Sequence, residues 1–192
     1  MNMPLEPKNS KWSIKKIKRY NIDAIKNAVS YFDSEWYLDT SRQETYKTHK
    51  DTKMFQLRYM DYNWNSFSGV KPEYYDVNKI NDDLAQFQVL EIFKDLEQEY
   101  ECTVVRAELV NMLANTSIRP HLDGGDMLNV SRRCHIPIIT NDKVYFTVLN
   151  NTVNMEEGYC YEINNGMLHS VKNDSDFDRV HLIIDLLPNK YL

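Results

Sequence analysis

The stretch RRCHIPIITNDKVYFTVLNN, residues 132–151, decides the class of fold. Two runs of β-branched and aromatic residues flank a polar turn at 140–142, and both runs are too short to be ordinary helices. Val, Ile, Tyr, Phe and Thr are enriched in strands, whereas Asn and Asp are enriched in turns. The stretch therefore predicts two short strands joined by a turn.

The same pattern extends over the chain from residue 101 onward. Strand-like runs also occupy residues 102–113, 159–164, 167–173 and 179–187. Polar turns separate these runs at fairly regular spacing, which is typical of an all-β sandwich or barrel. The second half of the chain is therefore expected to be a β-barrel.

The first hundred residues predict two amphipathic helices. Residues 21–36 have apolar side chains at helical spacing, namely Ile22, Ile25, Val29 and Phe32. Residues 82–100 have the clearest helical pattern, with a broad and slowly drifting apolar stripe. The stripe consists of Leu84, Phe87, Leu90, Phe93 and Leu96.

The remaining segments of this half are a terminal arm, a strand and a loop. Residues 1–20 are polar and basic and predict an arm or a short helix, residues 52–62 alternate as a strand does, and residues 63–80 predict a loop. We expect one structural domain. Residues 1–100 would be a lead-in of helices and a strand packed on the barrel, and residues 101–192 would be the barrel itself.

Composition narrows the classes of partner. The net charge is −5 and the only strongly basic segment is KKIKR at 15–19, which argues against a nucleic-acid partner. Apolar runs are far shorter than the ~20 residues of a membrane span, so we expect no membrane association. The sequence lacks the pattern of a signal peptide, and its three cysteines fit no zinc spacing. Reduced thiols and a cytoplasmic location are therefore expected.

Two H-x-D sequences are candidate metal-binding pairs. In His121-Leu122-Asp123, residues two apart on a strand would direct an imidazole and a carboxylate to one point. Gly124-Gly125 would end that strand, and His169 on another strand-like run could add a third ligand. Two histidines and one carboxylate form the metal-binding triad of non-haem Fe(II) oxygenases.

The second pair, His49-Lys50-Asp51, is the better candidate for a coincidence. Composition alone makes one accidental H-x-D unsurprising, and this pair lies in a Lys-rich stretch without a strand pattern. His49 is expected at the surface or on the substrate side.

Arg179 opens the last strand-like run, ten residues after His169. A guanidinium inside a barrel requires an anion, and it binds carboxylates in a bidentate manner. The anion could be a dicarboxylate cosubstrate. A salt bridge to Asp176 or Asp178 is the equally plausible structural alternative.

Four blocks in order resemble the aspartyl/asparaginyl β-hydroxylase-like Fe(II)/2-oxoglutarate oxygenases, a family that includes free-proline hydroxylases. The blocks are PHLD at 120–123, RCHIPI at 133–138, MEEGYCYEINNGMLHSVKN at 155–173 and RVHLIID at 179–185. The resemblance covers about residues 103–188. It implies a mainly β fold with N-terminal helices, built around a double-stranded β-helix, which is a cupin-like jelly-roll barrel.

The resemblance also implies a site, a set of cofactors and a reaction. The implied iron ligands are His121, Asp123 and His169. Arg179 would pair with the distal carboxylate of 2-oxoglutarate, and Arg133 and His135 would lie near its other end. The implied reaction uses Fe(II), 2-oxoglutarate and O2, with ascorbate as a possible reductant. It would hydroxylate an unactivated C–H of an amino acid or amino-acid residue and release succinate and CO2.

The sequence departs from the family at one position and leaves several alternatives open. The small hydroxyl residue that helps to hold the cosubstrate has no clear counterpart, since the nearby residues are Val110 and Asn111. His135 and His181 could be structural, and the aromatic cluster at 59–64 could be core, loop or a lid. A cupin-like metal-binding or sensor module without turnover is the alternative function. The substrate, a small molecule or a peptide, stays open.

Overall fold

The computed structural model describes residues 12–61 and 63–192. Its strands are β1 Ile14–Arg19, β2 Thr52–Met60, β3 Tyr74–Asp76, β4 Cys102–Met112, β5 Thr116–His121, β6 Arg132–Ile139, β7 Val144–Val148, β8 Asn151–Val153, β9 Tyr159–Ile163, β10 His169–Asn173 and β11 Arg179–Pro188. Its helices are α1 Asp23–Val29, η1 Glu35–Tyr37, α2 Ser41–Thr45, η2 Lys47–His49, α3 Asp83–Tyr100, α4 Asp126–Val130 and η3 Asn189–Tyr191.

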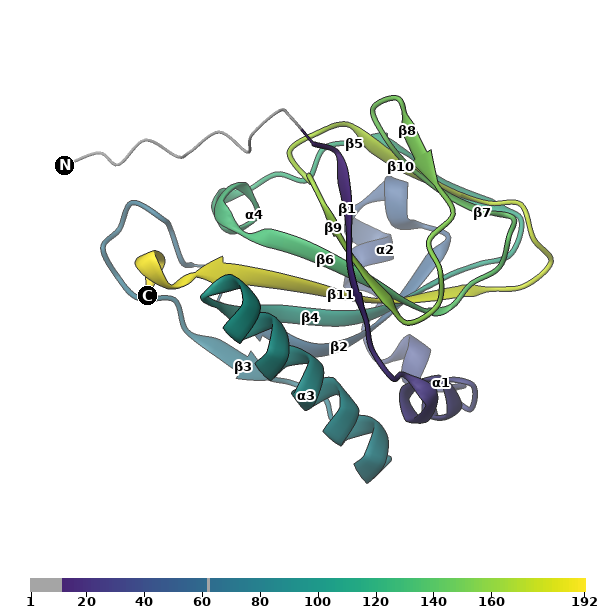
Figure 1. The fold of residues 1–192 in the computed structure, drawn as a ribbon, viewed down its shortest axis with the longest axis horizontal. Coiled ribbons are helices and arrows are strands. Elements are labelled where there is room, and N and C mark those ends of the chain that lie inside the picture. The colour runs from purple at the N-terminus through teal and green to yellow at the C-terminus, as the bar shows by residue number, and fades with distance from the viewer. Residues whose placement is uncertain (1–11, 62) are drawn as a thin grey trace.

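Within the described residues the strands form two antiparallel sheets. The larger has seven strands in the order β1-β9-β6-β11-β4-β2-β3, and the smaller has four in the order β5-β10-β7-β8. The helices α1 and α3 cover the outer face of the larger sheet, and the smaller sheet packs on its inner face (Figure 1). The expected fold, mainly β with a jelly-roll double-stranded β-helix, is confirmed.

Both faces of the larger sheet are buried at its central strands β4 and β11, and this explains their nearly continuous apolar sequences. Nine of the ten residues of β11 are buried, and β4 is similar. Outward residues such as Leu182 and Ile184 join a core with α1 and α3, whereas Phe146 and Val148 of β7 belong to a second core between the sheets. The larger sheet therefore has an apolar core on each side. Polar side chains on its inner face need hydrogen-bond partners within the protein.

The predicted apolar stripe of α3 is wrong for three of its five residues, while Phe93 and Leu96 are buried. The helix begins after Asp82, whose side chain accepts a hydrogen bond from the Ala85 amide, but the exposed fractions of three stripe members, Leu84, Phe87 and Leu90, are 63%, 58% and 44%. The buried residues are Ala85, Val89, Ile92, Phe93 and Leu96. Steps of three residues drift around a helix of 3.6 residues per turn, whereas alternating steps of four and three keep one face on the sheet.

Three other local expectations also need correction. Residues 14–19 form strand β1, paired with β9, rather than an arm or helix; residues 1–11 of that expectation lie outside the described part of the chain. The helix expected over 21–36 ends at Val29 and is followed by the short η1. The expected loop at 63–80 contains β3.

Strands from before residue 101 complete the larger sheet. β1, β2 and β3 all belong to it, with β2 paired directly to β4. The division into a lead-in of residues 1–100 and a core of residues 101–192 stays a prediction. None of the helices in the described ranges is long and apolar enough to cross a membrane.

Candidate metal centre

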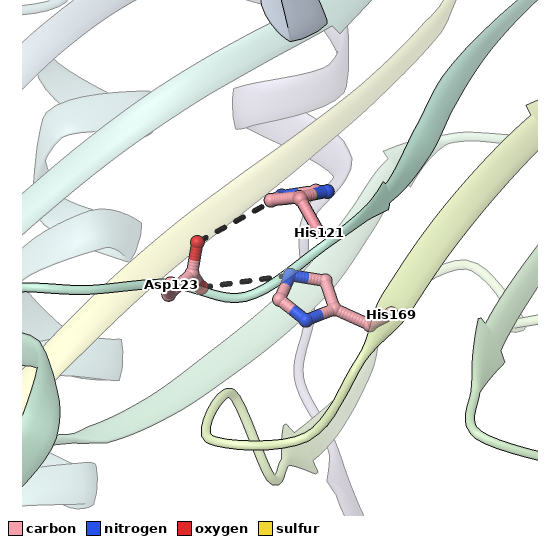
Figure 2. Close-up of side chains that lie close together, drawn as sticks. All are labelled: His121, Asp123 and His169. Carbon is pink, nitrogen blue, oxygen red and sulfur yellow. Dashed lines mark ion pairs between the residues drawn. The ribbon is translucent and has the colours of Figure 1, made fainter.

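The predicted metal ligands His121, Asp123 and His169 lie together at one end of the smaller sheet (Figure 2). His121 ends β5, His169 begins β10, and the two are register partners across this antiparallel pair. Asp123 follows β5 by two residues, in the loop before α4. One potential ligand atom of each residue lies within 4.8 Å of the others. The cluster thus forms because His121 and His169 are paired across two strands and Asp123 follows β5 by two residues.

Backbone carbonyls fix which ring nitrogen of each histidine faces the cluster. Nδ1 of His121 lies 2.8 Å from the Arg119 carbonyl oxygen, and Nδ1 of His169 lies 2.9 Å from that of Met167. A carbonyl only accepts, so each Nδ1 carries the hydrogen and each Nε2 keeps its lone pair. The Nε2 atoms lie 3.8 Å and 3.6 Å from the Asp123 carboxylate oxygens. Both rings are thus oriented as metal-ligating histidines are.

Asp123 is held by Arg133 and not by its own loop alone. Arg133 donates one hydrogen bond to Asp123 and two to Asp185, at 2.8 Å and 3.1 Å. Burial acts to raise the pKa of Asp123, but the charge of Arg133 outweighs it and leaves that pKa below its ordinary value. The carboxylate is therefore ionised and oriented, ready to bind a cation.

Arg133 also belongs to a buried ion network on the inner face of the larger sheet. Asp185 of β11 accepts from Arg133 and, at 2.7 Å, from Arg106 of β4. These two arginines hold the pKa of Asp185 well below its usual range, against the opposing effect of burial. Arg133, expected beside the cosubstrate, is thus already paired with two carboxylates.

A second polar cluster, which we call the inner chamber, consists of Arg179, His181 and His135. A nitrogen of Arg179 lies 2.9 Å from Nδ1 of His181, and that Nδ1 lies 3.5 Å from Nδ1 of His135. The ring of Phe146 contacts His135 at 5.1 Å between centroids and stacks on His169 at 6.1 Å. One phenyl ring therefore separates the inner chamber from a candidate metal ligand.

The two acids that could have neutralised Arg179 are used elsewhere. Asp178 accepts hydrogen bonds from Asn111 and a backbone amide, and Asp176 accepts from Asn115. Among the described residues no carboxylate forms a salt bridge with Arg179, although its exposed fraction is only 1%. Burial, followed by the charge of Arg42, lowers the pKa of this guanidinium to about 9. An arginine so placed matches an anionic ligand.

His49, expected at the surface or on the substrate side, lies beside the cluster and lines the cleft in front of it. Its ring stands edge-on to that of His121, with centroids 5.5 Å apart. Burial and the nearby Arg42 lower its pKa to about 3. Asp51 does not join the three ligand atoms, so this H-x-D is not a second metal pair within the described ranges. No local pattern could have placed His49, because η2 reaches the site through the packing of the N-terminal segment.

The cluster opens into a cleft of about 710 Å³. Its walls come from α2, η2, β2, β4 and the loop that leads into α4; Tyr59 and Trp64 of the predicted aromatic cluster line it, and residue 62 of that cluster lies outside the described part. In the wall of the cleft, Arg42 donates to Glu108 at 2.9 Å, with both side chains largely buried. The cleft is thus charged, partly aromatic and open to the candidate metal centre.

The donor set fits Fe(II) and the inner chamber fits a carboxylate. Two imidazole nitrogens with free lone pairs and one ionised carboxylate oxygen are the ligands of mononuclear non-haem iron. A buried arginine without a carboxylate partner in the described ranges lies beside them. The residues present therefore match a metal ion together with an acidic cosubstrate.

Comparison with known proteins places the chain in context. The family model described as aspartyl/asparaginyl beta-hydroxylase matches residues 20–188. An oxidoreductase of the 2OG-Fe(II) oxygenase family from Burkholderia pseudomallei is 14% identical, with a TM-score of 0.51 over 72% of this chain and 67% of that one. The viral collagen prolyl hydroxylase of Paramecium Bursaria Chlorella virus-1, in its 2OG complex, is 6% identical, with a TM-score of 0.58 over 92% and 97%.

Identities this low establish a shared fold and nothing more specific. The match to the family model, by contrast, spans most of the chain. No curated protein matches the sequence.

Proposed function

The chain belongs to the aspartyl/asparaginyl β-hydroxylase family and is a 2-oxoglutarate-dependent oxygenase, and on that premise we propose that it hydroxylates an unactivated C–H of an amino acid or amino-acid residue. Succinate and CO2 are the proposed coproducts. The observation that carries the proposal is the adjacency of His121, Asp123 and His169 to a buried Arg179 that has no carboxylate partner among the described residues.

His121, Asp123 and His169 are the proposed ligands of Fe(II). Bound Fe(II), together with 2-oxoglutarate and O2, supplies the oxidation that exchanges a C–H for a C–OH bond, and ascorbate keeps the metal reduced in assays. The protein contributes three side chains whose potential ligand atoms already lie close together. Arg133 supports this role because its hydrogen bond orients Asp123.

Arg179 is the proposed anchor of the distal carboxylate of 2-oxoglutarate. Its charge is buried on the inner face, within one aromatic ring of His169. His135 and Arg133, both on β6, are proposed to border the same cosubstrate nearer the metal. Because Arg133 pairs with Asp123 and Asp185, it would also affect metal binding by orienting the proposed iron ligand Asp123.

The cleft supports a small or short substrate. Its volume of about 710 Å³ would hold an amino acid or a peptide end, and Arg42 and Glu108 in its wall pair with each other. Tyr59 and Trp64 add aromatic surface. The three cysteines are free and buried, which agrees with the proposed cytoplasmic setting.

Anaerobic titration tests the proposal directly. Protein loaded with Fe(II) should develop the metal-to-ligand charge-transfer absorption on addition of 2-oxoglutarate, and with O2 and amino-acid or peptide candidates it should release succinate. His121→Ala and Arg179→Ala should abolish turnover. Asp123→Ala should weaken Fe(II) binding at least about tenfold, whereas the matched control Asp51→Ala, in the other H-x-D, should not.

Two outcomes would contradict the proposal. Full turnover in His121→Ala or Arg179→Ala would remove the assigned roles. A metal-loaded protein that does not bind 2-oxoglutarate would instead be a cupin-like metal-binding or sensor module.

A further inference from the structure

The inner chamber holds more hydrogen-bonding capacity than its own residues use. Nε of Arg179, Nε2 of His181 and Nε2 of His135 are each buried without a hydrogen-bond partner among the described residues. Folded proteins leave few buried polar atoms in this state. Nε of an arginine always donates, so a cluster that leaves it buried and unpaired indicates a ligand that accepts hydrogen bonds.

The hydrogen position on His181 follows from its neighbour. An arginine side chain can only donate, so Nδ1 of His181, which lies 2.9 Å from a nitrogen of Arg179, must accept. Burial and the charge of Arg179 hold the pKa of His181 well below its ordinary value, which keeps the ring neutral. Its single hydrogen is therefore on Nε2, the atom without a partner in the described structure. His181 is a buried neutral donor.

The position of His181 places this donor beside the arginine. Arg179 and His181 are two residues apart on β11, and both are 1% exposed. The register partner of His181 on the neighbouring β4 is Val110, which has no polar side-chain atom. Of the two register partners His181 and Val110, only His181 can provide a side-chain donor next to Arg179.

We propose that His181 is a second hydrogen-bond donor to the distal carboxylate of 2-oxoglutarate, beside Arg179. The inference rests on the proposed function, because it requires a dicarboxylate in the inner chamber. In it, the neutral imidazole is a donor that Val110 cannot supply, and the side chain of its neighbour Asn111 already donates to Asp178. A carboxylate there would give partners to the unsatisfied donors of Arg179 and His181.

His181→Phe tests the inference, because a phenyl ring fills the same space without a donor. In anaerobic titrations of Fe(II)-loaded protein, the Kd for 2-oxoglutarate should rise roughly tenfold to a hundredfold, as for the loss of one hydrogen bond to a charged group. The charge-transfer band reports this binding, and calorimetry with Mn(II)-loaded protein checks it independently. The Kd for the metal itself should not change.

Two comparisons separate a contact from a packing defect. 2-Oxobutyrate keeps the metal-chelating end but lacks the distal carboxylate, so wild type and His181→Phe should bind it equally. His181→Gln places an amide nitrogen near the position of Nε2 and should retain most of the 2-oxoglutarate affinity. His181→Asn places its amide near Nδ1 and should behave like His181→Phe. The Gln and Asn pair carries the test if the Phe variant does not fold.

The outcomes distinguish this inference from the proposed function. If wild type binds 2-oxoglutarate and His181→Phe binds it with the same Kd, His181 only fills space and the inference is wrong while the function stands. An equal loss of 2-oxobutyrate binding also overturns it. If metal-loaded wild type binds no 2-oxoglutarate, the inference and the proposed function fall together.

Discussion

Asp185 is a single charged residue within the apolar run LIIDLL, and its environment explains why a charge is tolerated there. It is 1% exposed, yet Arg133 and Arg106 donate to both of its oxygens. Through Arg133 the network continues to Asp123. The buried carboxylate of Asp185 thus holds the Arg133 side chain, which in turn orients the proposed iron ligand Asp123.

Asp185→Asn should destabilise the protein by about 3–5 kcal/mol, because it leaves two largely buried arginines short of a counter-charge. Urea unfolding at neutral pH measures the change in the free energy of unfolding. Asp174→Asn is the matched control: Asp174 pairs with Lys172 at the surface, and its loss should cost less than about 1 kcal/mol. Equal small effects at both positions would show that the network contributes nothing to stability.

Helix α3 shows how a helix can be predicted correctly and its orientation wrongly. The pattern over 82–100 predicts the helix to within one residue, since it occupies Asp83–Tyr100. Apolar residues lie on more than one side of it, however, and only contact with β4 selects Val89 and Leu96 over Leu84. Periodicity identifies the element, while packing chooses its face.

Leu96→Ala and Leu84→Ala compare the two faces with the same substitution. Leu96 is 0% exposed and Leu84 is 63% exposed. The first should cost about 2–5 kcal/mol through lost burial and a cavity, and the second should stay within about 0.5 kcal/mol. Thermal or urea unfolding of both variants provides the measurement. A larger cost at Leu84 would mean that the side of the helix carrying Leu84, and not the side carrying Leu96, packs on the sheet.

The fold buries two histidines between its two sheets in their neutral form. His135 and His181 are nearly fully buried. Burial is the main cause that holds both pKa values well below the ordinary one, and Arg179 adds to it in each case. For His135, Arg133 and His169 lower the pKa further, and Asp185 opposes them. Folding therefore keeps these rings unprotonated at any pH near neutrality.

Stability should consequently fall as the pH falls below about 6.5, the ordinary histidine pKa. In that range the unfolded chain binds protons that the folded chain does not, so increasing acidity stabilises the unfolded state relative to the folded one. These two rings should remove roughly 3 kcal/mol between pH 7.5 and pH 5.5. Urea unfolding of metal-free protein at both pH values tests this.

His181→Phe should reduce the measured pH-dependent change by about 1.4 kcal/mol, the share of one ring that is neutral in the folded chain and titrates in the unfolded one. The comparison uses the slope against pH and not the stability at one pH, so the packing effect of the substitution cancels. An identical slope in variant and wild type would show that His181 is not held neutral by the fold.

Local patterns were sufficient for the strand-rich second half, the helix at 82–100 and the order of the four family blocks. Alternation and helical periodicity are properties of neighbouring residues, so they are visible in the chain alone. The candidates His121, Asp123 and His169 were also accessible, because a motif and its spacing are linear features, although their roles as iron ligands stay a prediction.

Contacts between distant residues could not be read in this way. Residues 14–19 form a strand because they pair with the edge of β9. His49 lies near His121 because of where η2 packs. The pairing of Arg133 with Asp185 likewise joins two strands that only the sheet brings together. Sequence patterns therefore established the elements and the candidate chemistry, whereas partners, faces and buried charges depended on long-range packing, which no local pattern encodes.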